Sequence, residues 1–268
     1  MAAITYDTPE LLAEFANRKG IRYPLLGDSD SAMIRAFGIL NDNFPPDHEW
    51  YGVPFPGTYV VNEHGVVTAK FFEEDHRERY NTSAVLVKEL GIGPGGRIAE
   101  VETRHLTLRY SASDEIVRPG NRVTLVVEIG LKQKMHVYAP GVQGYKAIEW
   151  RVKTSPGWLF HDLSLPDSKM LTLPAIGETV PVYEGRFRMT RDITFGQGGA
   201  VRPFLQPDET LRVEDSIYYQ ACDDRVCYLP QTVPVHWIFR YAEHDRERSP
   251  EPLRRRPRAS PPKPPAAP

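Results

Sequence analysis

Two cysteines, Cys222 and Cys227, are the side chains of this sequence that are best suited to covalent chemistry. They are the only cysteines among 268 residues, and four residues separate them. Thiols at this spacing can form a disulfide, exchange it with another protein or bind a metal ion. A structural zinc site needs four ligands, and only His236 lies nearby in the sequence. Three interpretations follow: a redox-active pair, a structural hairpin disulfide, and a metal site or free thiols.

The segments that flank the cysteines alternate between apolar and polar residues. The apolar members of this pattern are Ile217, Tyr219, Val233, Val235, Trp237 and Phe239. Runs of period two on both sides of a polar insert predict a β-hairpin with a four-residue loop. Residues that face each other at a non-hydrogen-bonded position have Cα atoms about 4.5 Å apart, within the range that a disulfide needs. We therefore expect Cys222 and Cys227 to form an intramolecular disulfide.

A disulfide across so short a loop stabilises a protein only weakly. Loop-closure entropy gives about 2 kcal/mol for a loop of about six residues, against about 5 kcal/mol for about a hundred residues. This comparison favours a role in chemistry, although a hairpin disulfide can also be structural. The charges beside the thiols act in opposite directions, because Asp223 and Asp224 would raise a thiol pKa and Arg225 would lower it.

Three strings of residues resemble a known redox domain. Tyr-Gln-Ala-Cys-Asp-Asp-Arg-Val-Cys-Tyr-Leu-Pro-Gln occupies residues 219–231, Met-His-Val-Tyr-Ala-Pro occupies 135–140, and Val-Tyr-Glu-Gly occupies 182–185. Together they resemble the N-terminal domain of the thiol–disulfide interchange protein DsbD over residues 100–242. The resemblance implies an immunoglobulin-like sandwich whose two cysteines carry electrons between a membrane partner and thioredoxin-like proteins. It also implies a periplasmic or other extracytoplasmic location.

Three side chains are candidates for serving the cysteines: His136, Tyr138 and Tyr219. Tyr138 matches a position of the DsbD domain, in which aromatic and acidic side chains surround the cysteines and a cap loop shields them. The segment 171–178 takes the place of this cap in chain order, but it has no aromatic residue. Each tyrosine could instead belong to the sandwich core, with its hydroxyl at the rim.

The first ninety residues have the pattern of an α/β layer. A strand at residues 4–7 leads into a helix that Thr8 and Pro9 can begin and Gly20 can end. A second helix begins near residue 30, a hairpin follows at 58–72, and a last helix covers 82–90. This order predicts an α/β layer built on one sheet.

The same segment resembles a thioredoxin-fold redoxin of the alkyl hydroperoxide reductase/thiol-specific antioxidant family, which is peroxiredoxin-like. The residues that carry the resemblance are Ile4–Asp7, Tyr23–Asp28, Phe37–Ile39 and Pro54–Val61. By this resemblance Pro56 takes the place of the proline that faces the family's reactive cysteine. That cysteine belongs to an earlier strand–helix unit, and residues 1–221 contain no cysteine. We therefore expect an incomplete thioredoxin-like fold that begins after this unit, and no peroxidase activity from this chain alone.

A break rich in glycine and proline at residues 91–97 separates two patterns. Beyond it, many short alternating runs end in Pro-Gly and Gly turns, which indicate an all-β sandwich. From residue 243 onward proline and arginine dominate, and this composition favours disorder. The predicted domains are a redoxin domain at 1–92, a linker at 93–100, a sandwich at 101–242 and a tail at 243–268.

Composition excludes several classes of protein. A formal net charge of -2 argues against a general nucleic-acid binder. No apolar run approaches the roughly 20 residues that cross a bilayer, and Met1–Ile4 does not begin a signal peptide. We expect neither a cofactor nor a metal. The prediction is a thiol–disulfide oxidoreductase that exchanges electrons through Cys222 and Cys227 with thioredoxin-like or membrane partners. The alternative is a non-enzymatic interaction module with a structural disulfide.

Overall fold

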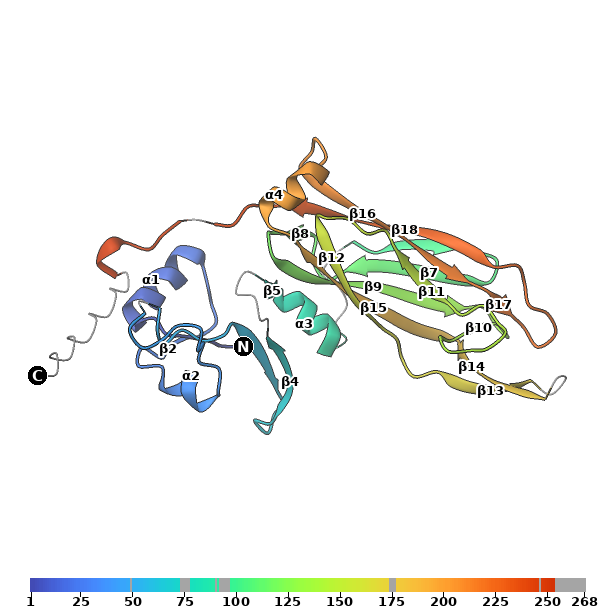
Figure 1. Ribbon diagram of the computed structural model, residues 1–268, viewed down its shortest axis with the longest axis horizontal. Helices are drawn as coiled ribbons and strands as arrows, with labels where there is room; N and C mark the ends of the chain where they lie inside the picture. Colours follow the sequence, from blue (N-terminus) through green and yellow to red (C-terminus); the bar gives the residue numbers. More distant parts are fainter. Residues whose placement is uncertain are drawn as a thin grey trace, which may run out of the picture. The chain divides into compact units, whose positions relative to one another are not determined.

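A computed structural model describes residues 1–48, 50–72, 78–89, 91, 97–173, 177–245 and 247–253 (Figure 1). The chain divides into two compact units. The first consists of residues 1–58 with the described parts of 72–76 and 245–268, including a short 3-10 helix at Glu251–Leu253. The second consists of residues 59–71 and the described parts of 77–244. No helix in the described residues is long and apolar enough to span a membrane.

The first unit begins with a strand–helix–strand segment. It consists of β1 (Ala3–Thr5), α1 (Pro9–Lys19) and β2 (Leu25–Gly27), and α2 (Ala32–Ala36) follows it. The Thr8 hydroxyl accepts a hydrogen bond from the amide of Leu11, and Gly20 ends α1 in the left-handed conformation. The predicted caps of the first helix are therefore confirmed. β1 and β2 pair in parallel.

The hairpin predicted at residues 58–72 forms a sheet of its own. β3 (Gly57–Val61) pairs with β4 (Val67–Phe72), and the amides of His64 and Val66 donate to the side-chain oxygen of Asn62 in the turn. The prediction of one sheet is wrong for the described residues, since β1–β2 and β3–β4 are separate two-stranded sheets. A single sheet would need a strand hydrogen-bonded to both pairs, and no described strand fills that place.

The last two elements of the predicted redoxin segment lie in the second unit, together with most of β3 and β4. β5 (Arg79–Tyr80) pairs in parallel with β9 (Asn121–Leu131), and α3 (Thr82–Glu89) packs against the same strand. The predicted linker is described only from residue 97 and the predicted tail only as far as 253, and the rest of both lies outside the described residues. The predicted domain boundaries stay a prediction.

Two sheets face each other in the second unit. The larger sheet has the order β12-β15-β9-β7-β6 and the smaller one the order β11-β16-β18-β8. Besides β9, the strands of the larger sheet are β6 (Ala99–Glu102), β7 (Leu106–Ala112), β12 (Trp158–Ser164) and β15 (Arg186–Phe195). Those of the smaller sheet are β8 (Ile116–Val117), β11 (Glu149–Val152), β16 (Thr210–Tyr219) and β18 (Gln231–Tyr241). α4 (Gly198–Val201) and a 3-10 helix (Arg202–Phe204) connect β15 to β16.

One continuous core fills the space between these sheets. Leu108, Val127 and Met189 enter it from the larger sheet, and Val213 and Phe239 enter it from the smaller one, all of them buried. The prediction of a mainly β domain is therefore confirmed. Its immunoglobulin-like topology and the thioredoxin-like nature of the first unit stay predictions.

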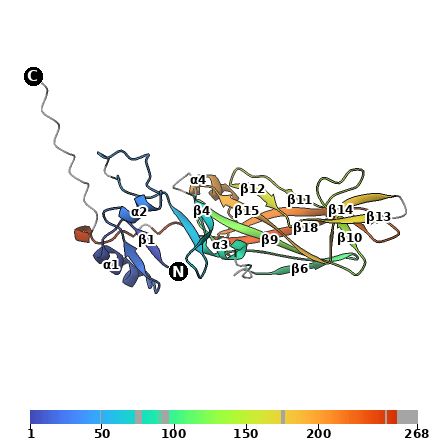
Figure 2. The same cartoon turned by 90° about the horizontal axis from the view of Figure 1, so that it is seen from below.

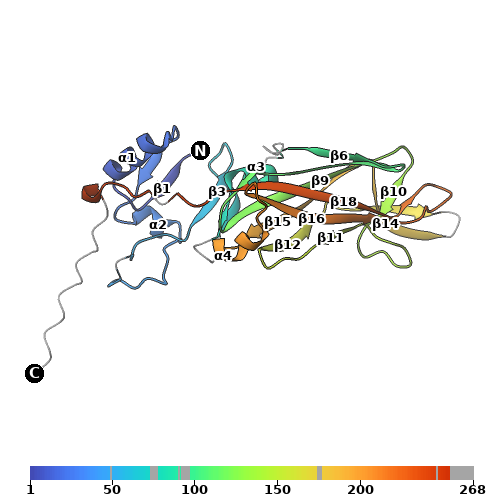
Figure 3. The ribbon, with the colours of Figure 1, turned by 90° about the horizontal axis from the view of Figure 1, so that it is seen from above.

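A third, four-stranded sheet extends one end of the sandwich. It has the order β13-β14-β10-β17, with β10 (His136–Tyr138), β13 (Lys169–Leu173), β14 (Glu178–Glu184) and β17 (Ala221–Cys222). Figures 2 and 3 show β10 and β14 at the end of this unit opposite α3 and α4. This small sheet carries the first cysteine.

Candidate functional site

The cysteine loop is the tip of a long hairpin. β16 and β18 pair in antiparallel fashion from Thr210↔Arg240 to Tyr219↔Gln231. Beyond that point the chain leaves the sandwich, and β17 pairs instead with β10 of the small sheet. Cys222 and Cys227 form a disulfide with Cα atoms 4.1 Å apart. The predicted hairpin and its intramolecular disulfide are confirmed.

The strand register brings five side chains to one face of the small sheet. His136 lies directly opposite Cys222 on one side and Glu184 on the other, and Tyr138 lies opposite Val182. Directly paired residues of an antiparallel sheet point to the same face. We call His136, Tyr138, Val182, Glu184 and Cys222 the cysteine face. The alternate residues, Val137 and Ala221, belong to the main core on the other side.

The two cysteines differ sharply in exposure. Cys222 is only 1% exposed and packs with Tyr138, Val180 and Val182, whereas Cys227 is an exposed residue of the loop. Solvent therefore reaches Cys227, whereas Cys222 is enclosed by its neighbours.

Tyr138 approaches both cysteines, since it packs with buried Cys222 and its hydroxyl is close to exposed Cys227. Its hydroxyl lies 3.5 Å from Sγ of Cys227, and a disulfide sulfur has no proton, so the hydroxyl is the donor. Its ring stacks on Tyr145 at 4.3 Å, and the Tyr145 hydroxyl donates to Glu178 over 2.9 Å. Burial raises the pKa of Tyr138, which keeps this hydroxyl protonated.

His136 is a buried histidine with an unused ring nitrogen. It is 4% exposed, and its Nε2 has no hydrogen-bond partner among the described residues. Burial lowers the pKa of His136, and the carboxylates of Glu184 and Asp223 oppose this shift. The imidazole is therefore neutral near neutral pH.

The loop itself is fixed by Asp223. Its carboxylate accepts hydrogen bonds from the amides of Arg225 and Val226 at 2.8 and 2.7 Å, and from the Tyr228 hydroxyl at 2.9 Å. These bonds lower the pKa of Asp223, the two amides most strongly. The Tyr228 ring packs on buried His105, with ring centroids 4.5 Å apart. Asp223 therefore holds the loop in shape.

Tyr219 and Pro56 do not lie with the cysteines. Tyr219 is fully buried in the main core, where its hydroxyl donates to Gln231 over 2.6 Å and lies 2.9 Å from Oγ1 of Thr103. Pro56 is half-buried in the first unit, and every described peptide bond is trans. Of the predicted side chains, the structure brings His136 and Tyr138 to the disulfide.

Sequence reasoning missed Tyr145, Glu178, Tyr228 and His105. Glu178 lay at the end of the predicted cap segment, whose residues 174–176 are outside the described part of the chain. Tyr228 adjoins Cys227 in sequence, and this adjacency was the available signal. His105 and Tyr145 approach the site only through tertiary contacts. Within the described residues, no group of three or more His, Cys, Asp or Glu side chains could hold a metal ion.

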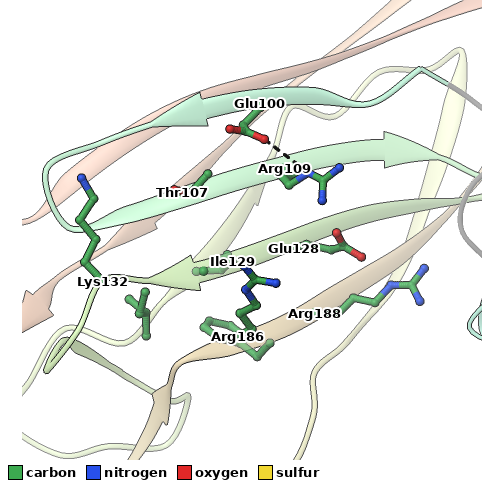
Figure 4. Close-up of a pocket in the computed structure, with 11 residues that line it drawn as sticks. Glu100, Thr107, Arg109, Glu128, Ile129, Lys132, Arg186 and Arg188 are labelled. Atoms are coloured by element: carbon green, nitrogen blue, oxygen red, sulfur yellow. Dashed lines mark ion pairs between the residues drawn. The ribbon is translucent and has the colours of Figure 1, made fainter.

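A separate basic groove of about 730 Å³ lies on the outer face of the larger sheet (Figure 4). Its cations are Arg109, Lys132, Arg186 and Arg188, and Arg109 pairs with Glu100 at 3.5 Å. Gly130 leaves the floor of this groove without a side chain. None of the cysteine-face residues lines it, so the groove is distinct from the disulfide site.

Comparison with known families covers both parts of the chain. Residues 1–70 match the model of the AhpC/TSA family, and residues 107–236 match that of the N-terminal domain of the thiol:disulfide interchange protein DsbD. The N-terminal part of the chain is thus similar to one family and the later part to the other. Both resemblances expected from the sequence are thus confirmed, and together with the disulfide they suggest a thiol–disulfide redox function.

Individual relatives cover parts of the chain. Two Mycobacterium tuberculosis proteins, each named a candidate peroxiredoxin, are 33% identical over 76 residues, which are 26% of this chain and 45% of theirs. The chain thus spans less than half the length of these relatives. The N-terminal periplasmic domain of ScsB from Proteus mirabilis is 13% identical, with 52% of this chain and 49% of that one covered and a TM-score of 0.35. The reduced DsbD N-terminal domain of Neisseria meningitidis is 15% identical, with 42% and 74% covered and a TM-score of 0.26.

The buried histidines predict acid sensitivity. Burial lowers the folded-state pKa of His105 and His136 below the ordinary value of 6.5, so the unfolded chain binds more protons just below that pH. Their contribution to stability is complete above about pH 6.5 and is lost as the pH falls below it. We expect the midpoint temperature of thermal unfolding to decrease as the pH is lowered from about 7.5 to about 5. The substitution His105→Phe should make this decrease smaller. Exposed His64→Gln is the matched control. An equal fall in wild type and His105→Phe would contradict the prediction.

Proposed function

We propose that this chain is a thiol–disulfide oxidoreductase that exchanges electrons with thioredoxin-like partner proteins through Cys222 and Cys227. The difference in exposure between the two cysteines carries this proposal. Exchange requires one sulfur that a partner can reach and a second that remains close enough to release the partner. The match of residues 107–236 to the DsbD N-terminal model supports the same reaction.

In the reaction, Cys227 attacks first. Its thiolate forms a bond to one sulfur of the partner disulfide, and the other partner sulfur leaves as a thiolate. The Cys222 thiolate then attacks Sγ of Cys227, which breaks the mixed disulfide and releases the second partner sulfur. The partner gains two electrons and two protons, and this chain ends with the Cys222–Cys227 disulfide.

The surface around Cys227 suits a protein partner. Val226 is 54% exposed and Leu229 is 86% exposed, and both belong to the same loop. Exposed apolar side chains beside a reactive group are typical of a docking surface. Because hydrogen bonds to Asp223 hold this loop, docking costs little ordering entropy. Tyr138 and His136 line the buried side of the disulfide, and a periplasmic or other extracytoplasmic setting fits the exchange.

The first unit contributes no thiol of its own, because residues 1–221 lack cysteine. Under this proposal it is a peroxiredoxin-like segment, and Pro56 has no reactive cysteine to face within this chain. The alternative function is an interaction module in which the disulfide only holds the loop.

The reduction potential separates the two functions. We expect the full chain, equilibrated in glutathione redox buffers, to show a Cys222–Cys227 potential above about −300 mV, since structural disulfides usually lie below that value. Alkylation of the free thiols followed by mass spectrometry measures the reduced fraction. A reduction potential below about −300 mV for the Cys222–Cys227 pair would support the interaction module instead.

A further inference from the structure

A carboxylate, an imidazole and a cysteine sulfur lie in one row across the small sheet. Glu184 on β14, His136 on β10 and Cys222 on β17 are directly paired residues of three neighbouring strands. Side chains paired in this way have Cβ atoms about 5 Å apart. The row therefore places an imidazole between a thiol-forming sulfur and a carboxylate. This order of groups is the one that activates a nucleophile through a base.

The environment of His136 suits a proton acceptor. Its Nε2 is buried and has no partner in the described part of the chain. The ionisable groups that face it are Glu184, Asp223, Tyr138 and, once reduced, Cys222. Lys169 lies 3.9 Å from Glu184 and is the cation closest to this row among the ion pairs of the described residues. The imidazole is thus neutral and free to accept a proton, and the neighbouring carboxylates partly offset the cost of charging it in a buried place.

The resolving step needs such a base. Cys222 is 1% exposed, and burial disfavours a thiolate because the charged form loses its hydration. Water cannot easily remove the proton from so buried a thiol. Among the residues of the cysteine face, His136 has the unpartnered buried nitrogen that can accept this proton.

We propose that His136 accepts the thiol proton of Cys222 in the resolving step and that the negative charge of Glu184 stabilises the imidazolium that forms. This role rests on the proposed exchange reaction. As the proton moves to His136, the Cys222 sulfur bonds to Sγ of Cys227, and the partner sulfur leaves with the electron pair of the mixed disulfide. His136 then returns the proton to solvent. In the opposite direction the same proton returns to the departing Cys222 sulfur.

The proposal predicts a distinctive pH profile. With His136 present, the resolving rate should be nearly constant above the pKa of His136 and fall below it. Without His136, the rate should follow the thiolate fraction of Cys222 and rise roughly tenfold for each pH unit. A purely structural histidine would change the rate without changing this slope.

The experiment follows the reduced full-length chain after mixing with oxidised glutathione. Acid quenching and mass spectrometry separate the Cys227–glutathione adduct from the final disulfide. We expect His136→Gln and His136→Phe to slow adduct decay about 100-fold near neutral pH, the lower end of what a positioned base contributes. In the Glu184→Gln variant, the fall of the resolving rate at acidic pH should begin at a lower pH, because the carboxylate of Glu184 raises the pKa of His136.

Two control variants carry the same His→Gln and Glu→Gln substitutions at positions outside the cysteine face. His236→Gln is on β18, and Glu128→Gln is on β9 (Figure 4), and both should leave adduct decay unchanged. If the adduct forms and decays at the wild-type rate and slope in both His136 variants, His136 is not the base, although exchange itself stands. If neither the adduct nor the final disulfide forms in wild type, both the exchange reaction and the role of His136 are refuted.

Discussion

Cys227→Ser is expected to abolish covalent capture of an oxidised thioredoxin-like domain, whereas Cys222→Ser is expected to trap it. The exposed sulfur of Cys227 is the one that a partner can reach, and Cys222 is buried beneath Tyr138. Without Cys222, no second sulfur lies close enough to release the partner, so the mixed disulfide persists. Without Cys227, the remaining thiol is inaccessible. The two single variants should thus differ in an all-or-none way.

A non-reducing gel after incubation of each variant with the oxidised domain measures this difference. A band at the summed mass should appear with Cys222→Ser, disappear on reduction, and be absent with Cys227→Ser and with the double variant. Adduct formation by Cys227→Ser but not by Cys222→Ser would reverse the assigned roles. Absence of adduct from both would favour the interaction module.

The hairpin was predictable because its signal is local. Alternation on both sides of a polar insert specifies two strands and a loop, and the pairing of Tyr219 with Gln231 shows that the register follows from this pattern. Tyr219 continues the alternation of Ile217 and lies in the main core, so of the two roles considered for it the core position is the one observed. His136 and Tyr138 lie in a short strand that is buried on both faces, so alternation there indicated no side.

The pairing of distant strands was not predictable in the same way. The caps of α1 depend on neighbouring residues and were correct, but the partner of a two-residue strand such as β5 depends on contacts far along the chain. No periodicity in Arg79–Tyr80 indicates pairing with β9 rather than with a strand of the first unit. The asymmetry between Cys222 and Cys227 likewise arises from the departure of β17 into the small sheet, which the sequence of the loop does not encode locally.

One buried carboxylate links β5 and α3 to the larger sheet. Asp192 on β15 is 6% exposed and accepts hydrogen bonds from Tyr80 of β5, Lys88 of α3 and Thr124 of β9 at 2.9, 2.9 and 2.7 Å. Four elements thus meet at a single side chain. Its removal leaves a partly buried ammonium group and two hydroxyl groups without their acceptor, and this loss is costlier than the loss of an exposed pair.

We therefore expect Asp192→Ala to destabilise the protein by roughly 3–5 kcal/mol. The midpoint of thermal unfolding should fall by about 10 °C, because each kcal/mol corresponds to about 2–4 °C for a domain of this size. Glu214→Ala, which removes an exposed ion pair with Lys153, is the matched control and should change the midpoint little. Asp192→Asn, which retains an acceptor but not the charge, should fall between wild type and Asp192→Ala. If Asp192→Ala unfolds at the temperature of the control, the carboxylate does not hold β5 and α3 to the sheet, and their packing must depend on the apolar contacts of Val85 and Val87 instead.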